Sequence, residues 1–356
     1  MDTHMKKLNT AIVGFGLSGS TFHAPLITNS NCFNLKYINT TQAEKVQKTY
    51  PTVSVISDFD QLCKIKELDL VIITAPNKEH FSLAKKALLS GKNVVVDKPF
   101  VISFSQGEEL INIAKKQNLL LSVFHNRRWD NGFLTLQKCI LEKKLQNISL
   151  YESYFDRFRP IVNKQKWKEQ EQEGSGILYD LGSHLIDQVL FTLGMPIEIF
   201  ADLQMQRTNA STLDYFHLIF QYEKTTAILG ATNLGFQPRP IFSILGENGF
   251  FLKNGLDPQE NSLNFIAKGE KLNIETWGHE NNIENKVKFV QINNGQQMLI
   301  DIPTLPGNYF QFYLQIYSAI VAKEKNPVDP KDALNVIKLI ELAYESNQLK
   351  KWIKVF

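Results

Sequence analysis

The sequence predicts an α/β domain with a doubly wound parallel sheet, followed by an α+β domain with a large, mostly antiparallel open sheet. Two observations carry this prediction. Strand and helix patterns alternate strictly over residues 1–125, and residues 126–356 then contain consecutive strands joined by tight turns. The length of 356 residues suits two domains at about 150 residues each.

The first domain shows six strand patterns separated by helical ones. The run LDLVIIT at residues 68–74 is apolar almost throughout, as expected of a parallel strand covered on both faces. We expect strands at residues 9–13, 33–38, 53–56, 68–74, 93–96 and 119–124, and helices at 23–29, 42–49, 79–89 and 105–117.

The second domain has a different texture, because its strands follow one another directly. We expect strands at residues 149–157, 197–206, 214–222, 225–233 and 239–253, and helices at 133–145, 177–193, 309–322 and 331–349. The last helix is a candidate to pack back on the first domain. One face of the sheet is expected to be apolar and free to contact a second subunit.

Composition excludes several classes of protein. Lys and Arg number 39 against 36 Asp and Glu, which argues against a nucleic-acid binder driven by bulk charge. The apolar segments are too short to span a bilayer, so we expect no membrane association. Cys32, Cys63 and Cys139 lie far apart and form no zinc or disulfide pattern. These features predict a cytoplasmic protein without a metal site.

A glycine-rich turn follows the first strand and leads into a helix. Its sequence, GFGLSG, comprises Gly14, Phe15, Gly16, Leu17, Ser18 and Gly19. In this context, glycines let backbone N–H groups approach a pyrophosphate, so the turn predicts a dinucleotide site. A purely structural glycine turn is the alternative.

The end of the second strand is where such sites contact the adenosine ribose. An acidic residue is typical of NAD sites there, but Asn39, Thr40 and Thr41 are all neutral. Nothing in this stretch repels a 2′-phosphate, although no arginine binds one either. The cofactor is therefore predicted to be NAD(P), with a slight preference for NADP.

Further polar residues follow the later strands, at the edge where doubly wound sheets bind ligands. Lys98, in the run Asp97-Lys98-Pro99, is positioned to contact both a nicotinamide and a substrate hydroxyl. The other candidates around the cofactor are Pro76, Asn77, His80, Asp97, Asn126 and Arg128.

Asp180 and His184 lie four residues apart in a predicted helix and so share one face. His184 is a candidate general base oriented by a carboxylate. Two alternatives stay open from the spacing alone, a metal site that includes Asp187 and a buried structural histidine. Arg157, on an aromatic strand, is either a cleft residue or a surface partner of acids.

Taken together, these motifs resemble the Gfo/Idh/MocA family of oxidoreductases over nearly the whole chain. The matching segments are GFGLSGSTFHAPL, TAPNKEHF, VVVDKPF, SVFHNRRWD, YFDRFRP, GILYDLGSHLIDQ and DYFHL. Three of these motifs, HNRRWD, DRFRP and YDLGSHLIDQ, resemble more narrowly those of bacterial NADP-dependent scyllo-inositol dehydrogenases. Asp97 departs from the Glu-Lys-Pro that is usual in the family.

The resemblance implies roles for these residues. Lys98 would be the catalytic lysine, and Asp180 with His184 the acid–base pair. The turn residues Gly14, Phe15, Gly16, Leu17 and Gly19 would hold the pyrophosphate. The substrate would contact Lys98, Asp180 and His184, and from its position on the aromatic strand we add Arg157 as a candidate.

The implied activity is hydride transfer between the nicotinamide of NAD(P) and a secondary alcohol of a cyclic polyol or sugar. The protein would form homodimers or homotetramers through its C-terminal sheet. Two alternatives are a reductase of another carbonyl compound and a non-catalytic NADP-binding sensor, because fold alone does not separate them.

Overall fold

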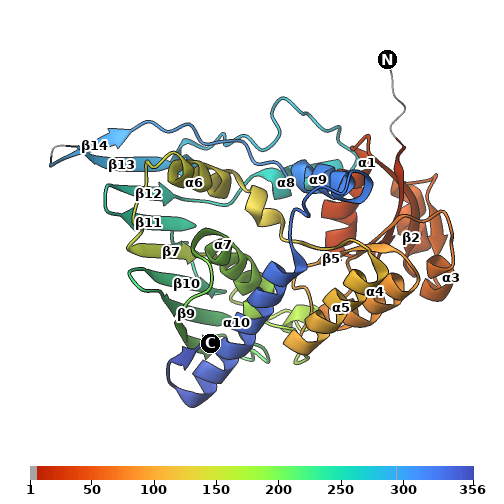
Figure 1. Cartoon of the computed structure of the whole chain (residues 1–356), viewed down its shortest axis with the longest axis horizontal. Coiled ribbons are helices and arrows are strands. Elements are labelled where there is room, and N and C mark those ends of the chain that lie inside the picture. Colours follow the sequence, from red (N-terminus) through yellow and green to blue (C-terminus); the bar gives the residue numbers. More distant parts are fainter. Residues whose placement is uncertain (1–5, 294) are drawn as a thin grey trace. The chain divides into compact units, whose positions relative to one another are not determined.

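The structure is a computed structural model that describes residues 6–293 and 295–356 (Figure 1). These residues form two compact units. The first unit holds the chain up to Asn126 and the segments Gln259–Trp277 and Asn308–Leu334. The second unit holds Arg127–Pro258, Gly278–Gly307 and Asn335–Phe356. The chain therefore returns twice to the first unit, whereas the sequence led us to expect one continuous second domain.

The first unit is built on a sheet of six parallel strands. In spatial order these are β3 (Ser54–Ile56), β2 (Phe33–Asn39), β1 (Leu8–Val13), β4 (Leu70–Ile73), β5 (Asn93–Asp97) and β6 (Leu121–Phe124). This is the strand order of a doubly wound dinucleotide-binding sheet, which confirms the predicted fold class. All four residues of β4 are buried, as the apolar run predicted.

Helices cover this sheet. They are α1 (Ala24–Thr28), α2 (Ala43–Thr49), α3 (Phe59–Cys63), α4 (His80–Leu89), α5 (Phe104–Gln117), α8 (Gln259–Ile266) and α9 (Phe310–Val321), with a π-helical turn η1 (Ser18–His23) and a 3-10 turn η2 (Asn77–Glu79). Helices α4 and α5 lie side by side (Figure 1). Helix α1 packs against β2 and against α9.

Aromatic packing explains why α9 belongs to the first unit. The rings of Phe312 and Tyr313 lie 5.0 and 5.8 Å from that of Phe124, at the end of β6. Phe33 on β2 packs edge-on against Tyr313 at 5.7 Å. Buried aromatic pairs of this kind contribute more than their area alone. Helix α9 lies wholly in the first unit, as do the first residues of the last helix, up to Leu334.

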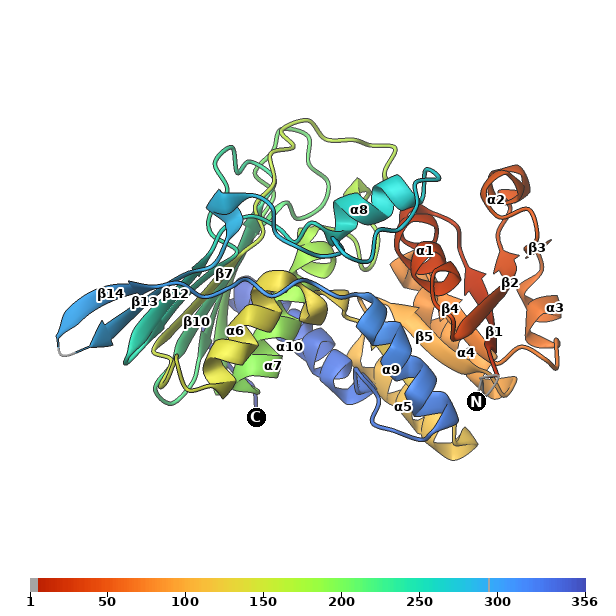
Figure 2. The ribbon, with the colours of Figure 1, turned by 90° about the horizontal axis from the view of Figure 1, so that it is seen from above.

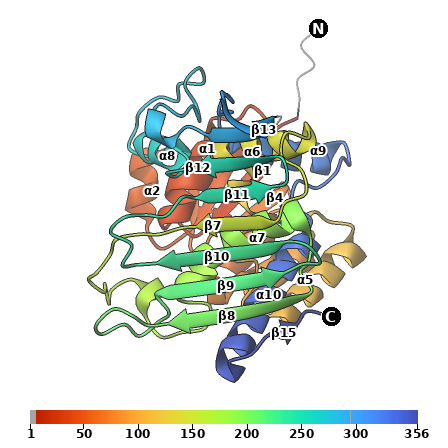
Figure 3. The ribbon, with the colours of Figure 1, turned by 90° about the vertical axis from the view of Figure 1, so that its left-hand side faces the viewer.

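The second unit is built on a nine-stranded sheet (Figure 3). In spatial order its strands are β14 (Gln296–Ile300), β13 (Lys288–Asn293), β12 (Gly249–Lys253), β11 (Phe242–Gly246), β7 (Leu150–Tyr154), β10 (Thr226–Thr232), β9 (Tyr215–Gln221), β8 (Glu198–Gln204) and β15 (Ile353–Lys354). Neighbours are antiparallel except β7 and β10, which run parallel. The predicted mostly antiparallel sheet is therefore confirmed.

One face of this sheet carries helices. The helical elements of the unit are α6 (Asn131–Leu141), α7 (Ser183–Leu193), most of α10 (Pro330–Leu349), and the short turns η3 (Asn126–Trp129), η4 (Trp167–Glu169), η5 (Leu178–Gly182) and η6 (Ile283–Asn285). Figure 2 shows α6 and α7 side by side on the same face. Strand β9 alternates accordingly, because Phe216, Leu218 and Phe220 are buried while the residues between them are partly exposed.

Some elements differ from the prediction. The expected strand at 239–253 is a hairpin of β11 and β12, turning at Glu247 and Asn248 as the turn residues indicated. The strand β13, the two edge strands β14 and β15 and the helix α8 were not predicted. Strand β14 is mostly exposed, so it has no alternation of apolar and polar residues to reveal it.

Candidate functional site

Two glycines of the turn after β1 are required by close backbone packing. Gly14 has φ +93°, and a Cβ there would lie 2.9 Å from the carbonyl oxygen of Thr74. A Cβ on Gly19 would lie 2.3 Å from the carbonyl oxygen of Gly14. The Thr74 hydroxyl donates to that same oxygen at 2.8 Å. These glycines therefore hold the turn against β4.

Gly16 differs, because a Cβ there would meet nothing within 4 Å. Gly16 and its neighbour Leu17 are exposed, with Leu17 at 69%, whereas Phe15 is buried. The open part of the turn is thus Gly16-Leu17, beside the π-helical turn η1. An exposed glycine that no packing requires fits the close approach of a pyrophosphate, so these residues fit a dinucleotide.

The end of β2 presents neutral side chains, as the sequence predicted. The Asn39 amide donates to the carbonyl oxygens of Ile56 and Ser57, at 2.8 and 3.1 Å, and so ties β2 to β3. The Thr40 hydroxyl accepts from the backbone of Gln42. Asn39 and Thr40 thus have structural contacts, and Thr41 is exposed.

A cation that the sequence did not reveal lies beside this stretch. Lys45, on α2, donates from Nζ to the carbonyl oxygen of Phe15 at 3.0 Å and lies 5.2 Å from the centre of the Phe15 ring. The turn therefore carries a positive charge next to the position where the ribose is expected. The signal available in the sequence was a lysine in the helix after β2.

His80 is buried and links two loops of the ligand edge. Its Nδ1 contacts the carbonyl oxygen of Pro99 at 2.8 Å, and its Nε2 contacts that of Ala75 at 2.9 Å. Burial lowers the pKa of His80, although the charge of Asp97 acts in the opposite direction. With 1% exposure, His80 supports the loops that carry Pro76 and Lys98, which favours an indirect role.

Asp97 and Lys98 end strand β5. The backbone N–H of Lys98 donates to Oδ1 of Asp97 at 2.8 Å, and Oδ2 lies 3.9 Å from Nε2 of His23. Burial alone would raise the pKa of Asp97, but His23, Lys98 and Ser18 hold that pKa well below its ordinary value. The acid before the lysine is therefore an ionised, partnered carboxylate.

The residues after β6 are divided between the two units. Asn77 and Asn126 are both buried in the first unit, at 8% and 5% exposure. Arg128, in the second unit, forms a buried ion pair with Asp187, in which Nε and Nη2 lie 2.9 and 2.7 Å from carboxylate oxygens. The guanidinium of Arg128 is thus held by a specific carboxylate, which accounts for Asp187 without a metal ion.

Asp180 is held by two cations of the second unit. Its carboxylate accepts from Nη1 of Arg157 at 3.2 Å and from Nζ of Lys168 at 2.6 Å. Arg157 in turn lies 4.9 Å from the ring centre of Phe155. The sequence predicted Arg157 but not Lys168, because Lys168 stands in the charged run KQKWKEQEQE, which is typical of a solvated loop.

Asp180 and His184 lie on consecutive helical elements rather than on one α-helix. Asp180 is part of the π-helical turn η5, and His184 belongs to the first turn of α7. Gly176, with φ +85°, turns the chain into this segment. π-Helical turns occur frequently at functional sites. His184 is 6% exposed, while the Asp180 side chain is 18% exposed.

Comparison with known protein families decides the assignment. Residues 8–125 match the Gfo/Idh/MocA model described as an oxidoreductase family with an NAD-binding Rossmann fold. Residues 137–355 match the model of the same family's C-terminal alpha/beta domain.

The chain belongs to the Gfo/Idh/MocA oxidoreductase family. It is therefore an NAD(P)-dependent oxidoreductase, as its motifs led us to expect.

Individual members of the Gfo/Idh/MocA family match over most of the chain. The oxidoreductase YdgJ of Escherichia coli is 40% identical, covering 95% of this chain and 96% of its own. The scyllo-inositol 2-dehydrogenase (NADP(+)) IolW of Bacillus subtilis is 37% identical, covering 97% and 95%. The crystal structure of the oxidoreductase yvaA of Bacillus subtilis has a TM-score of 0.94 at 36% identity, covering 98% and 99%.

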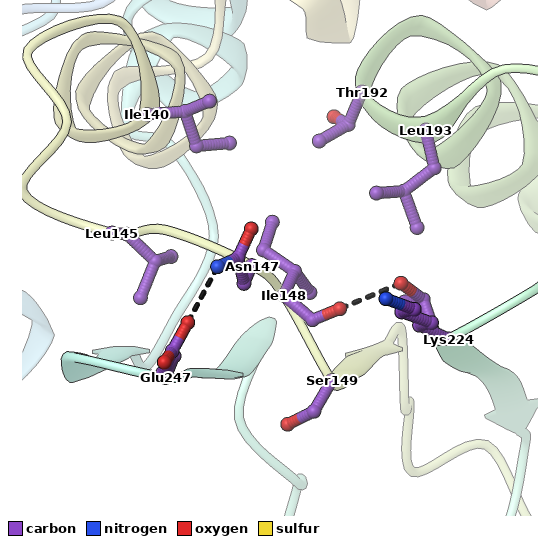
Figure 4. A pocket seen from close by; sticks show the side chains of 10 residues that line it. Ile140, Leu145, Asn147, Ile148, Ser149, Thr192, Leu193, Lys224 and Glu247 are labelled. Carbon is purple, nitrogen blue, oxygen red and sulfur yellow. Dashed lines mark hydrogen bonds between the residues drawn. The ribbon is translucent and has the colours of Figure 1, made fainter.

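The second unit also contains a pocket, which lies apart from the family's motif residues (Figure 4). Aliphatic side chains such as Ile140, Leu145 and Leu193 line it, with Lys224 and Glu247 at its edge. None of its ten lining residues is a predicted site residue.

The described residues contain neither a cluster of metal ligands nor a helix suited to a membrane. Among residues 6–293 and 295–356, no three His, Cys, Asp or Glu side chains are grouped as metal ligands would be. Within the same described ranges, no helix combines the length and apolarity that a membrane crossing requires.

Proposed function

We propose that this protein is a dehydrogenase that oxidises a secondary alcohol of a cyclic polyol, of the scyllo-inositol type, with NADP as the preferred cofactor. The observation that carries the proposal is the 37% identity to IolW over 97% of the chain. Lys98, Asp180 and His184, which the family resemblance assigns to catalysis, support it because all three are present.

In this proposal His184 takes the proton of the substrate hydroxyl, directly or through Lys98. An imidazole is suited to this role because its unperturbed pKa lies near neutrality. The Lys98 ammonium stabilises negative charge on the substrate oxygen as the carbonyl forms. Its backbone is fixed by the hydrogen bond to Asp97.

Asp180 orients the acid–base residue in the proposed mechanism. Because Arg157 and Lys168 each donate to its carboxylate, Asp180 is restrained from two sides. A carboxylate held in this way provides a fixed acceptor for the substrate or for the imidazole. Arg157 then serves as a supporting residue next to the substrate.

The dinucleotide supplies the hydride acceptor at C4 of the nicotinamide when it is bound. We assign its pyrophosphate to the open part of the glycine turn at Gly16 and Leu17. Gly14 and Gly19 shape that turn through their packing on Thr74. On the family resemblance, Asn126 and Arg128 remain candidates for the nicotinamide end, and Asn77 remains a candidate for the cofactor cleft.

The preference for NADP rests on Lys45 as well as on the neutral end of β2. A 2′-phosphate adds negative charge beside the ribose, and the Lys45 ammonium lies 3.0 Å from the Phe15 carbonyl in this region. A lysine binds phosphate as a point charge, without the bidentate geometry of arginine. This explains how a site without arginine can still favour NADP.

We also propose that the protein is a cytoplasmic homodimer or homotetramer that assembles through the helix-free face of the nine-stranded sheet (Figure 3). That face mixes polar residues with apolar ones such as Phe200, Ile219 and Leu245, the last of which is 41% exposed. Partly exposed apolar residues on an open sheet are typical of a subunit interface.

A substrate screen tests the proposed function. Inositol stereoisomers and cyclic sugars are each incubated with NAD⁺ or NADP⁺, and nicotinamide reduction is followed by absorbance. We expect turnover of at least one inositol, with a higher kcat/KM for NADP⁺. Turnover of sugars but of no inositol would show that the substrate is a sugar rather than a cyclic polyol of the inositol type. Dinucleotide binding without turnover of any alcohol or carbonyl compound would instead indicate a sensor.

A further inference from the structure

A buried polar cluster lies behind Lys98 in the first unit. It consists of His23 from η1, Asp97 from β5 and Tyr313 from α9. Nε2 of His23 lies 3.9 Å from Oδ2 of Asp97, and its Nδ1 contacts the Tyr313 hydroxyl. His23 and Tyr313 are fully buried, and the Asp97 side chain is 14% exposed. The imidazole therefore connects a carboxylate at the strand end to a phenol on a helix.

The cluster is joined to both parts of the site that the first unit contains. The carboxylate of Asp97 accepts from the backbone N–H of Lys98 at 2.8 Å. The side chain of Ser18, within the glycine turn, contacts the same carboxylate. A displacement of Asp97 would therefore also displace the proposed catalytic lysine and the turn that we assign to the dinucleotide.

Ionisable and polar groups face Asp97 from several elements. They are His23 and Ser18 on η1, Lys98 after β5, His80 on α4 and Tyr313 on α9. Burial and the negative charge of Asp97 raise the pKa of Tyr313 well above its ordinary value, so the phenol stays protonated. A protonated hydroxyl can act as donor to Nδ1 of His23, while Nε2 faces Asp97 at 3.9 Å, which is an ion-pair distance rather than a hydrogen-bond distance.

Simple core packing does not require this arrangement. Apolar side chains of similar size would fill the same volume without the cost of burying polar groups, which is offset only when those groups are partnered. The aromatic neighbours of His23, with the Phe124 ring at 4.3 Å, already supply apolar contact. The contact with the Tyr313 hydroxyl instead fixes the imidazole ring of His23 beside the Asp97 carboxylate.

We propose that His23 is a positioning residue for the reaction, which acts through Asp97 on Lys98 and on the glycine turn, with Tyr313 fixing its ring. This inference rests on the proposed function in that it takes Lys98 to be catalytic. In sequence His23 looks like an isolated histidine with a structural role. The structure adds the carboxylate and the phenol on either side of it.

The first test measures the reactivity of Lys98 without substrate or cofactor. The protein is acetylated with acetic anhydride at fixed pH, and the modification of Lys98 is followed by peptide mass spectrometry. In Asp97→Asn we expect Lys98 to react about threefold faster or more, because loss of the neighbouring negative charge favours the neutral amine. In His23→Ala we expect the rate to change by a similar factor, because Asp97 is no longer held in one place beside Lys98. Phe33→Leu, which trims a ring packed on Tyr313, is the matched packing control and should leave the rate unchanged.

The second test measures steady-state kinetics of the holoenzyme. For His23→Ala we expect kcat to fall roughly tenfold or more while KM changes little, because a misplaced group costs rate rather than affinity. His23→Gln keeps a donor toward Asp97 and should recover most of the loss. Tyr313→Phe should show a smaller loss, and Phe33→Leu should lower Tm but not kcat.

The outcomes separate the two proposals. An unchanged labelling rate of Lys98 in His23→Ala overturns the positioning role, whatever the substrate is. The same holds if kcat follows Tm across all variants, or if His23→Gln is as slow as His23→Ala. A wild-type protein that oxidises no alcohol contradicts the proposed function alone, since the labelling test does not depend on turnover.

Discussion

In the part of the chain that the structure describes, each unit contains a π-helical turn, and the two turns place their functional side chains in opposite environments. In the first unit, η1 follows the glycine turn and directs His23 into the interior, where Asp97 and Tyr313 enclose it. In the second unit, η5 keeps Asp180 partly exposed between Arg157 and Lys168. The Lys168 side chain itself is 44% exposed.

This difference separates a rigid part of the machinery from an adjustable one. Packing surrounds the first turn and determines the backbone positions of Gly14, Gly19 and Lys98. Charge holds the second, and charges near the surface can exchange partners when a polar ligand arrives. A cofactor common to a whole family suits the first arrangement, whereas substrates that differ between members suit the second.

The largest loss of activity is expected for the two residues proposed to act on the substrate, Lys98 in the first unit and His184 in the second. His184→Ala should lower kcat by about 10²–10⁴, the range for loss of a positioned general base. Lys98→Ala should cost at least as much, because it removes a charge next to the substrate oxygen. The double variant should be little slower than the slower single one, since residues that act as a unit are non-additive. Wild-type kcat in His184→Ala would refute the acid–base role.

The rigid part is tested next by Gly16→Asp. Because a Cβ at Gly16 meets nothing within 4 Å, the substitution should leave the fold intact by circular dichroism. The added charge near the pyrophosphate should weaken dinucleotide binding about a hundredfold, since like charges in contact cost several kcal/mol. Fluorescence titration with NADPH measures this, and Gly16→Ala is the matched control. Equal affinity in wild type and Gly16→Asp would remove the dinucleotide from this turn.

The adjustable part is tested by Lys168→Met, which keeps the length of the side chain but removes its charge. Arg157 still holds Asp180, so kcat/KM for the polyol should fall only about fivefold, as for a partly exposed ion pair. Dinucleotide affinity should not change. If Lys168→Met were as slow as His184→Ala, Arg157 alone would not hold Asp180, and the second π-helical turn would not be the adjustable part of the site.

A smaller effect is expected for Lys45→Met, since Lys45 is exposed. Affinity for NADPH should drop about fivefold, the upper range for an exposed charge pair, and affinity for NADH should stay the same. Lys48→Met, on the same helix, is the control variant. Equal losses for both dinucleotides would assign Lys45 to the turn rather than to a 2′-phosphate.

The smallest effect is expected from chelation. The proposed roles of Lys98 and His184 use a cation and an imidazole of the chain itself, so a metal ion has no assigned part in them. Activity after dialysis against EDTA should equal that of the untreated enzyme. If activity were lost on dialysis and Mg²⁺, Mn²⁺ or Zn²⁺ restored it, a metal ion would take part in the reaction and the proposed roles of Lys98 and His184 would be incomplete.

Sequence patterns predicted the first unit better than the second, for physical reasons. Buried parallel strands such as β4 are apolar throughout and can be recognised in the sequence. Gly14 and Gly19 are required by close backbone packing, so their spacing is also a recognisable pattern. Edge strand β14 is exposed and has no such pattern. Asp97, Asp180 and His184 were visible as residue types in motifs. Lys45, Lys168 and Tyr313 were not, because their significance comes from contacts across 30, 12 and 290 positions of the chain.

The position of β7 in the nine-stranded sheet has a consequence for the order of folding. Strand β7 comes first in the sequence of its unit but lies in the middle of the sheet, between β10 and β11. Its partners at residues 226–232 and 242–246 leave the ribosome only after β8 and β9 have been synthesised. The six parallel strands of the other sheet are all complete by Phe124. During synthesis, then, Tyr151 of β7, which is buried in the folded protein, stays in an unpaired strand until β10 and β11 have been made, and this exposes the segment to aggregation.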